Sequence, residues 1–516
     1  MGRRLQQAAL AAAAMATVMA VTLTGMQPAA ADGPTVTGGG SSFASLIINQ
    51  WRADVAKAPY NNRINYSSAG SGFGRDKYIS GALDFGQSDI AFLDEEIPRV
   101  KGSGRGDFVY VPTVAGALAF MFNVIGTNGQ RITNVKLTAN DVCRIFTVPD
   151  IKWNDPAIVA TNPGIPLPAS KIRPVVRSDR SGTSYVFSEF CIARAPAVWN
   201  AFVSFIGRGN FGQDAYLAQR RPISQWPNGY GSVSQAFASD GIASAVANDS
   251  TGKDSITYIE TGYTKVKRLP AAQVQNAVGV FTPPNPANST VALGFASPNG
   301  DGTFKLSSTG GDPRAYFPST YSYAIVQTKG FDPAKGAVMA SYLNYAVCTG
   351  QERAEPLLYS RLSSVLVNIA LDATAKIPGA PARPATCAAP PPPKLVTVAP
   401  GAAGAKGGAA GGAAGGAAGG AVGGAAAGAA DAAAAAGGAT DPAATVEGAA
   451  ETAGAVSGDG SGAAGGVTES AAGVTPVEGG PGGPENSEVL FLLLLGGGLL
   501  AAGGAAAKGS KEKWTS

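Results

Sequence analysis

The chain of 516 residues contains no histidine. This absence excludes Ser-His-Asp and Cys-His catalysis, phosphoryl transfer through histidine, and most zinc and copper sites. Charged residues make up only 14% of the chain, and 39 basic residues nearly balance 35 acidic ones. No block of Lys and Arg with interleaved aromatic residues is present, so nucleic acid is not an expected partner. Hydrolytic chemistry is therefore disfavoured, and we expect no enzymatic activity, no metal ion and no cofactor.

Cysteine is also scarce, with four residues in the whole chain. The amino terminus is typical of a secretory signal peptide, because two arginines precede an apolar segment and three alanines precede Asp32. We assign residues 1–31 to this signal, and no cysteine lies near its end to carry a lipid. In the oxidising compartment outside the cytoplasm the four cysteines are expected to pair, and three pairings are open to them. We predict the two pairs that are local in the chain, Cys143–Cys191 and Cys348–Cys387.

Aromatic residues are almost absent from a Pro/Ala/Gly tract that begins near Pro390. Such a composition cannot bury a core, and we predict a disordered linker over residues 389–487. The apolar run 488–507 has the length of one membrane span. Three lysines follow in residues 508–516, the predicted cytoplasmic tail. No LPxTG-type sorting sequence precedes the run, so we favour a retained transmembrane helix over a tail that is cleaved, and a protein anchored at the cell surface.

The octet Arg177–Ser184 is a polar stretch at a predicted strand-to-helix turn. It follows an apolar run typical of a buried strand and precedes helical spacing of apolar residues. Ser181 can cap this helix, and Gly182 lets the backbone approach a ligand closely. Free N–H groups at a helix start, beside an arginine, suit a phosphate or a carboxylate. Taken alone, the octet is equally compatible with an ordinary capped helix and a surface arginine.

Two earlier stretches repeat this strand, turn and helix pattern. One is Val36–Phe43, where glycines precede Ser41 and Ser42, either of which can cap a helix. The other has a strand over residues 63–67 and a Gly-Ser-Gly turn around Ser71. A further short strand ends at an acidic residue, Asp89. Alternating strands and helices predict an α/β fold.

Two places in the chain are expected to cross between lobes. The strand-like runs 108–114 and 117–123 are separated by Gly116, and a second strand-like run covers residues 321–326. These crossings divide a module of residues 32–388 into lobe 1, residues 34–114 and 320–388, and lobe 2, residues 115–319. Two α/β lobes joined by two crossings suit hinge closure on a ligand.

Five motifs occur in one order: Gly-Gly-Gly-Ser-Ser-Phe, Gly-Ser-Gly, Asp-Phe-Gly-Gln-Ser-Asp, Lys-Trp-Asn-Asp-Pro and Arg-Ser-Asp-Arg-Ser-Gly-Thr-Ser. With this set the chain resembles the phosphate-binding protein of the phosphate-specific ABC importer, the PstS family, over roughly residues 36–372. The resemblance implies a type II periplasmic-binding-protein fold. It also implies a monomer that captures inorganic phosphate and delivers it to ABC permease subunits.

The resemblance assigns roles to residues on both lobes. Asp89 would accept a hydrogen bond from the protonated oxygen of phosphate, whereas sulfate at neutral pH brings no such proton and would be repelled. Asp179 would orient the arginine of the site rather than bind the ligand. The expected ligand-binding residues are Ser42, Phe43 and Ser71 as donors, Asp89 as acceptor, Arg177 as the charged bidentate contact, and Ser181, Gly182 and Thr183 as the cap from lobe 2.

The chain departs from the family pattern in places. Ala44 stands where a proline is common, and Arg180 stands where a small residue is common. Arg180 could strengthen the positive field or simply face solvent. The region 208–304 matches poorly. The long tract and the anchor also motivate an alternative, a surface-displayed binding or adhesion protein with the same fold and a different or vestigial ligand.

Overall fold

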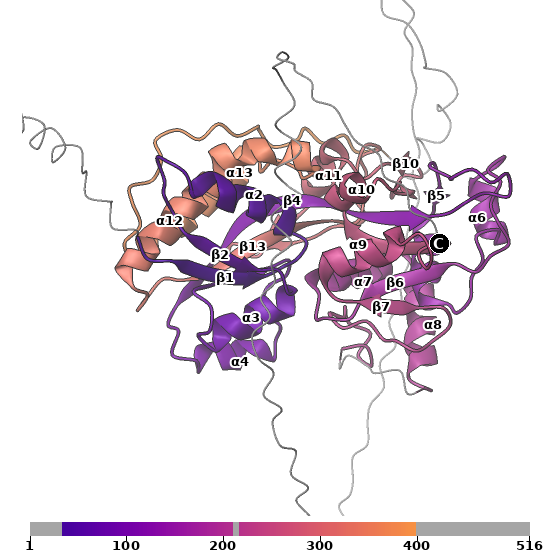
Figure 1. Cartoon of the computed structure of the whole chain (residues 1–516), viewed down its shortest axis with the longest axis horizontal. Coiled ribbons are helices and arrows are strands. Elements are labelled where there is room, and N and C mark those ends of the chain that lie inside the picture. Colours follow the sequence, from indigo (N-terminus) through magenta and orange to yellow (C-terminus); the bar gives the residue numbers. More distant parts are fainter. Residues whose placement is uncertain (1–32, 210–215, 399–516) are drawn as a thin grey trace, which may run out of the picture. The chain divides into compact units, whose positions relative to one another are not determined.

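The computed structural model describes residues 33–209 and 216–398 (Figure 1). The predicted signal peptide, transmembrane helix and cytoplasmic tail lie outside the described residues, as does the predicted linker from residue 399 onward. Within the described ranges, no helix has both the length and the apolar character that crossing a membrane requires.

One eight-stranded mixed sheet runs through the described part, in the order β2-β1-β3-β13-β4-β8-β6-β7. Strands β1, β2 and β3, from the lobe 1 range, are parallel, and so are β8, β6 and β7 from the lobe 2 range. Strand β13 is antiparallel to both of its neighbours. The bounds are β1 Val36–Gly40, β2 Ile64–Ser67, β3 Phe85–Ser88, β4 Phe108–Asn123, β6 Arg173–Arg177, β7 Ser234–Ala236, β8 Ser255–Glu260 and β13 Ser319–Gln327.

Strand β4 joins the two ends of this sheet. Its residues 108–117 pair with β13, and its residues 118–123 pair with β8. The two predicted runs on either side of Gly116 therefore form one continuous strand. A Cβ atom at Gly116 would lie 3.2 Å from the ring of Tyr359 and 3.3 Å from that of Phe43. Close packing, rather than a break in the strand, accounts for this glycine.

Helices cover both faces of the sheet. Figure 1 shows α3 and α4 on one face of β1–β3, and α2, α12 and α13 on the other. At the other end of the sheet, α7 and α9 both pack on β8. The bounds are α2 Ser45–Val55, α3 Ser71–Ile79, α4 Glu96–Lys101, α5 Ala139–Thr147, α6 Pro156–Thr161, α7 Gly182–Arg194, α8 Pro196–Ile206, α9 Ala238–Ala247, α10 Gly262–Lys267, α11 Pro286–Leu293, α12 Pro333–Val347 and α13 Ser364–Thr374.

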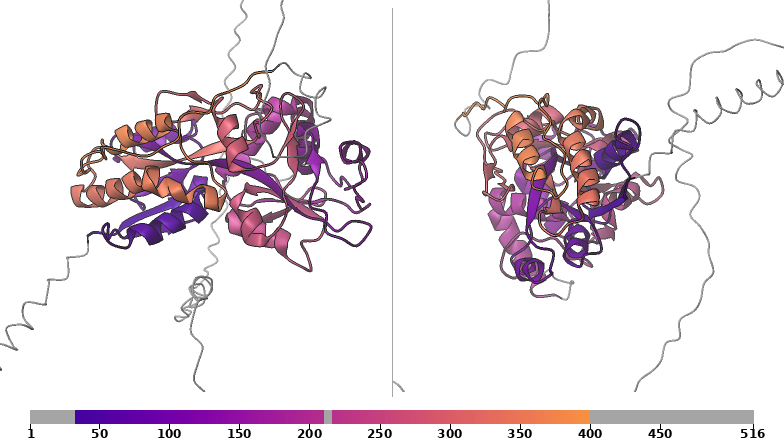
Figure 2. Two further views of the ribbon diagram at one scale, coloured as in Figure 1. Left: turned by 90° about the horizontal axis from the view of Figure 1, so that it is seen from above. Right: turned by 90° about the vertical axis from the view of Figure 1, so that its left-hand side faces the viewer.

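Smaller elements complete the fold, which Figure 2 shows from two further sides. Strands β5, β9 and β10 form a three-stranded sheet, and β11 and β12 form a two-stranded one. Two 3-10 helices follow α12. The bounds are β5 Lys136–Leu137, β9 Gln273–Gln275, β10 Phe281–Thr282, β11 Ser297–Pro298, β12 Phe304–Lys305, η1 Thr349–Arg353 and η2 Glu355–Leu357.

Both predicted disulfides are present. Cys143 on α5 pairs with Cys191 on α7, with their Cα atoms 5.7 Å apart. Cys348, at the end of α12, pairs with Cys387. Each bond joins residues of one predicted lobe range, so the prediction from local pairing is confirmed.

The folded part reaches past residue 388, where the predicted linker begins. The backbone N–H of Val396 donates to Oδ2 of Asp312 at 2.8 Å, and that of Val398 donates to the carbonyl of Gly311 at 2.9 Å. The carbonyl of Pro390 accepts from Ser364 at 2.8 Å. The predicted linker therefore does not begin at residue 389, because the backbone of residues 390–398 still forms hydrogen bonds with the folded module.

Candidate functional site

The candidate site lies where strands β1, β3, β6 and β8 end and helices α3, α7 and α9 begin. Asp89 follows β3, and Arg177 and Glu260 are the last residues of β6 and β8. In open α/β sheets the carboxyl ends of the strands are where ligands bind. The fold therefore brings polar residues that are far apart in the sequence to one edge of the sheet.

Asp89 is buried and receives hydroxyl donors from both lobes. Ser41 Oγ donates to Oδ1 of Asp89 at 2.5 Å, and Ser71 Oγ donates to Oδ2 at 3.3 Å. Thr183 Oγ1, from α7, lies 3.5 Å from Oδ2. Burial raises the pKa of Asp89 above its ordinary value, while the hydroxyl donors and the charge of Arg177 act against this shift. A carboxyl group in such surroundings is suited to share a proton with a ligand.

Arg177 is also buried, and Asp179 holds its side chain in place. Nε and Nη2 of Arg177 donate to the two carboxylate oxygens of Asp179 at 2.7 and 2.5 Å. The backbone N–H of Ala238 donates to the same carboxylate at 3.0 Å. Burial alone would lower the pKa of Arg177, but Asp179 raises it above the ordinary value. Asp179 thus occupies two of the five guanidinium donors and fixes the orientation of the Arg177 side chain.

Ser42 and Phe43 make contacts different from those of a helix cap. Ser42 Oγ lies 2.9 Å from Ser239 Oγ and accepts a hydrogen bond from the Ser239 N–H at 3.0 Å. The carbonyl of Phe43 accepts from the hydroxyl of Tyr359 at 2.5 Å. Helix α2 begins at Ser45 without a side-chain cap. Ser41 Oγ accepts from the N–H of Ala44 at 3.3 Å, so the predicted cap forms in the turn before α2 and not at the first residue of the helix. The hydroxyls of Ser41 and Ser42 also bind partners from distant parts of the chain.

The start of α7 approaches lobe 1 closely. Ser181 Oγ accepts from the N–H of Ser184 at 3.2 Å, so the predicted cap is present here. A Cβ atom on Gly182 would lie 2.5 Å from Ser71 Oγ and 2.8 Å from Cβ of Asp89. On the facing side, a Cβ on Gly70, whose φ is +93°, would lie 2.0 Å from Oδ2 of Asp179. Only glycine at these two positions allows the lobes to meet in this way.

Arg180 links the two lobes. From the sequence, its side chain could either have strengthened the positive field of the site or faced solvent. Its guanidinium forms an ion pair with Asp76 of α3, and Nη1 lies 3.6 Å from Oε1 of Glu96. The carbonyl of Arg180 also accepts from the N–H of Gly72 at 2.8 Å. This last contact occupies one of the N–H groups at the start of α3.

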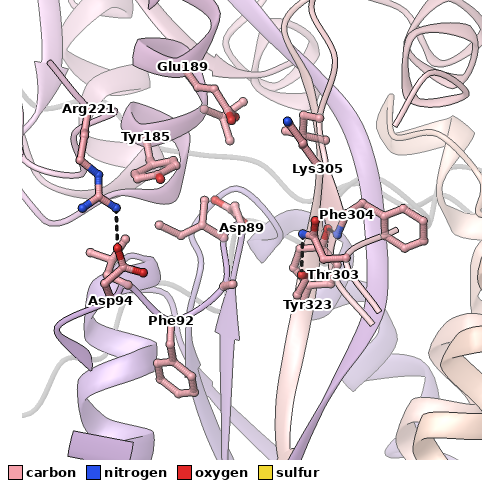
Figure 3. Close-up of a pocket in the computed structure, with 16 residues that line it drawn as sticks. Asp89, Phe92, Asp94, Tyr185, Glu189, Arg221, Thr303, Phe304, Lys305 and Tyr323 are labelled. Atoms are coloured by element: carbon pink, nitrogen blue, oxygen red, sulfur yellow. Dashed lines mark hydrogen bonds and ion pairs between the residues drawn. The ribbon is translucent and has the colours of Figure 1, made fainter. Parts of the chain in front are cut away.

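A pocket of about 230 Å³ opens beside Asp89 (Figure 3). Arg221 and Asp94 form an ion pair of 2.8 Å at its edge. Burial raises the pKa of Glu189 in its wall to about 7, and the charge of Lys305 opposes that shift. The wall therefore carries both signs of charge, in contrast to the donor-rich surroundings of Asp89. Within the described ranges, no group of three or more Cys, Asp and Glu residues could hold a metal ion.

The structure brings together all eight residues that were expected to bind the ligand, around Asp89, Arg177 and the start of α7. Three further residues at the same place were not predicted: Ser41, Ser239 and Glu260. Ser41 was visible as a neighbour of Ser42. Glu260 is an acidic residue at the carboxyl end of a strand, as Asp89 is, which is a signal that could have identified it. For Ser239 the sequence offers no comparable signal.

Comparison with known proteins places this site in a family context. A family model described as a PBP superfamily domain matches residues 25–349. The phosphate-binding protein PstS of Xylella fastidiosa (strain 9a5c) is 31% identical over 335 residues, which are 64% of this chain and 82% of that protein. PstS of Haemophilus influenzae is 27% identical and covers 65% of this chain and 90% of its own length. A crystal structure of the ancestral soluble variant of the human phosphate-binding protein aligns with a TM-score of 0.50 and 17% identity, over 67% of this chain and 99% of that one, and it supports the fold alone.

Proposed function

The chain belongs to the PstS family of phosphate-binding proteins within the PBP superfamily, and from this premise we propose that it captures inorganic phosphate between its two lobes and delivers it to an ABC permease for import. In this role it is an extracytoplasmic substrate-binding protein, not an enzyme. The observation that carries the proposal is the placement of buried Asp89 beside buried Arg177, with hydroxyl groups from both lobes around them.

The donors explain why an anion would bind. Arg177 supplies charge, and the start of α7 adds N–H groups at Gly182 and Thr183 to which the helix dipole gives partial positive character. The expected donors from lobe 1 are Ser42, Phe43 and Ser71. Because the guanidinium is held by Asp179, little conformational entropy remains to be lost on binding.

Asp89 explains which anion would bind. Monobasic and dibasic phosphate each carry a proton that the carboxylate can accept in a hydrogen bond. Sulfate at neutral pH carries none, and two acceptors would then face each other without a proton between them. Buried charges that repel a competing ligand contribute to specificity as much as attractive contacts do.

The proposal is tested by calorimetric titration of the purified full chain with inorganic phosphate, and with sulfate as competitor. We expect saturable one-to-one binding of phosphate that excess sulfate does not displace. The absence of phosphate binding, or equal affinity for sulfate, would contradict it.

We also propose that the chain is a monomer and is anchored by residues 488–507. The apolar run followed by three lysines supports an anchor at the outer face of the cytoplasmic membrane. Removal of residues 488–516 should then move the protein from the membrane fraction to the soluble one. An unchanged distribution would argue against this anchor.

A further inference from the structure

Glu260, the last residue of β8, is a buried acid without a partner. It is 0% exposed, and neither of its carboxylate oxygens accepts a hydrogen bond of normal geometry from the described residues. Across the strand pair it faces Leu118 of β4, which offers no polar group. An ionised carboxylate in such a place is costly, because it has lost water and gained no hydrogen bond of normal geometry in exchange.

The elements around β8 do not supply a compensating charge. Arg177, from the neighbouring β6, is the cation that acts on Glu260, and it is already bound to Asp179 through two hydrogen bonds. Asp89 acts on Glu260 with the same sign of charge. The β4 residues paired with β8, Leu118–Asn123, include no titratable side chain.

The other titratable groups nearby do not neutralise Glu260 either. They are the phenols of Tyr258 on β8, Tyr263 on α10 and Tyr359 after η2, together with Asp240 on α9. Asp240 is 71% exposed and pairs with Lys267. None of these groups is a cation, and the one cation among their partners, Lys267, already pairs with Asp240.

The carboxyl groups at the site outnumber its cations. One cation, Arg177, faces three carboxyl groups, those of Asp179, Asp89 and Glu260. With all three ionised, the site would have an excess of two negative charges before any anion entered. A proton on Glu260 removes one of these charges. Asp89 and Asp179 both accept hydrogen bonds as carboxylates, whereas Glu260 accepts none of normal geometry that protonation could break.

We propose that Glu260 holds its proton at neutral pH, that phosphate binds only to this uncharged form, and that loss of the proton sets the alkaline limit of phosphate binding. This inference rests on the proposed function and adds a specificity-determining residue to it. Glu260 need not touch the ligand, because it acts through the charge that the ligand and Arg177 experience.

The electrostatic surroundings agree with this role. Burial raises the pKa of Glu260 well above its ordinary value, and the charge of Asp89 adds to the shift. The backbone N–H of Glu260 itself and the hydroxyl of Ser239 oppose this rise in pKa, although neither forms a hydrogen bond of normal geometry with the carboxylate. The charge of Arg177 also opposes it. A bound anion would raise this pKa further, so binding and retention of the proton favour each other.

The experiment compares the wild type with Glu260→Gln, which keeps the shape of the side chain and cannot lose the proton. Phosphate dissociation constants of the full chain are measured by calorimetry between about pH 6 and pH 10. Both proteins share the ionisation of phosphate itself and that of Asp89, so the ratio of their constants isolates Glu260. We expect a constant ratio at low pH, and a wild type that weakens by up to about tenfold more per pH unit once Glu260 ionises.

Asp240→Asn, a change at a nearby exposed carboxylate, serves as the matched control and should follow the wild type. A ratio that stays constant over the whole range overturns the proposal. Failure of the wild type to bind phosphate at any pH would instead contradict the proposed function. If Glu260→Gln does not fold, infrared difference spectra replace it. A protonated carboxyl band that phosphate shifts, and that persists in both Asp89→Asn and Glu189→Gln, supports the proposal, and its absence at neutral pH overturns it.

Discussion

At the scale of single residues, Asp89 is a negative group at the place where an anion is proposed to bind. Its carboxylate is held by hydroxyl donors from Ser41 and Ser71, so it can remain an acceptor without a cation of its own. A ligand that brings a proton adds one more donor to this set. A ligand without a proton adds only repulsion, and in a buried site solvent screens that repulsion poorly.

Replacing Asp89 by Asn should therefore weaken discrimination between phosphate and sulfate. The amide can donate as well as accept, so the penalty against sulfate is removed. We expect the affinity ratio to fall by about ten- to a hundredfold, which corresponds to roughly 1.4–2.8 kcal/mol. Competition calorimetry at neutral pH measures this ratio directly.

Asp84→Asn provides a control within the same strand motif. Asp84 accepts from Lys335 Nζ at 2.8 Å and from the backbone N–H of Thr37 at 2.8 Å, and it makes none of the site contacts. Its replacement should leave the selectivity unchanged. Equal selectivity in the wild type and in Asp89→Asn would show that some other group rejects sulfate.

At the scale of secondary-structure elements, the contact between α7 and α3 decides how closely the lobes approach. Gly182 begins α7, and its Cα hydrogen faces Ser71 and Asp89 where a side chain would collide. The adjoining N–H of Gly72, in α3, is bound to the carbonyl of Arg180. A Cβ atom on Gly72 would lie 2.5 Å from Cβ of Arg180. The two helix starts therefore fit together in this way only while Gly72 and Gly182 are both glycine.

Gly182→Ala should push the lobes apart and weaken phosphate binding. The added methyl group cannot be accommodated unless Asp89 or the start of α7 shifts, and overpacking of this kind typically costs about 1–3 kcal/mol. If this cost falls on the closed form, phosphate affinity should drop by roughly five- to 150-fold. The measurement is a calorimetric titration of the variant, with thermal unfolding to verify that it folds.

Gly241→Ala, inside α9, is the matched control. A Cβ atom there would make only ordinary contacts, at 3.6 Å from Ala236. The change should stabilise α9 by roughly 0.5–1 kcal/mol, because alanine favours helix more than glycine does, and should leave phosphate affinity unaltered. Similar losses of affinity in both variants would argue against a special role for the approach at Gly182.

The sequence was sufficient to predict elements whose determinants are local. The strand before Arg177 and the helix after Ser181 follow from apolar spacing and a cap, and both are present. In the local pattern Gly116 separates two strand-like runs at a crossing between lobes. Its actual reason, the rings of Phe43 and Tyr359, comes from two other parts of the chain and is invisible to a local pattern.

The hydroxyl groups of the candidate site illustrate the same limit. Ser41 and Ser42 both stand at a position typical of a cap, yet one binds Asp89 and the other binds Ser239, 197 residues away. Motif order was sufficient to collect the expected site residues. It could not rank Ser41 against Ser42, nor indicate that Glu260 lacks a partner, because those properties arise only when strands β1, β3 and β8 end side by side.

At the scale of the whole described part, one sheet connects both lobe ranges through β4. Residues 108–117 of β4 pair with β13, and residues 118–123 pair with β8. Backbone hydrogen bonding is therefore continuous from the lobe 1 range to the lobe 2 range. A single large cluster of buried apolar residues also includes Trp51 of α2 and Trp199 of α8. We therefore expect the two ranges to unfold together, although closure can still move them relative to each other.

The two disulfides test this expectation, since they lie in different lobe ranges and close loops of similar length. Their sequence separations are 48 and 39 residues. Chain entropy then predicts that each stabilises the protein by about 4 kcal/mol, with a difference between them of only about 0.2 kcal/mol. If the described part unfolds as one unit, replacing Cys143 and Cys191 by Ser and replacing Cys348 and Cys387 by Ser should lower the same free energy of unfolding by nearly equal amounts.

Two probes distinguish a single transition from separate ones. Trp153, Trp199 and Trp226 lie in the lobe 2 range, so tryptophan fluorescence is weighted toward it, while far-ultraviolet circular dichroism follows both ranges. In guanidinium titrations of each double variant the two signals should coincide, because both ranges share β4. If loss of Cys143–Cys191 shifted only the fluorescence transition, the ranges would be independent folding units, and β4 would act as a hinge strand without coupling their stabilities.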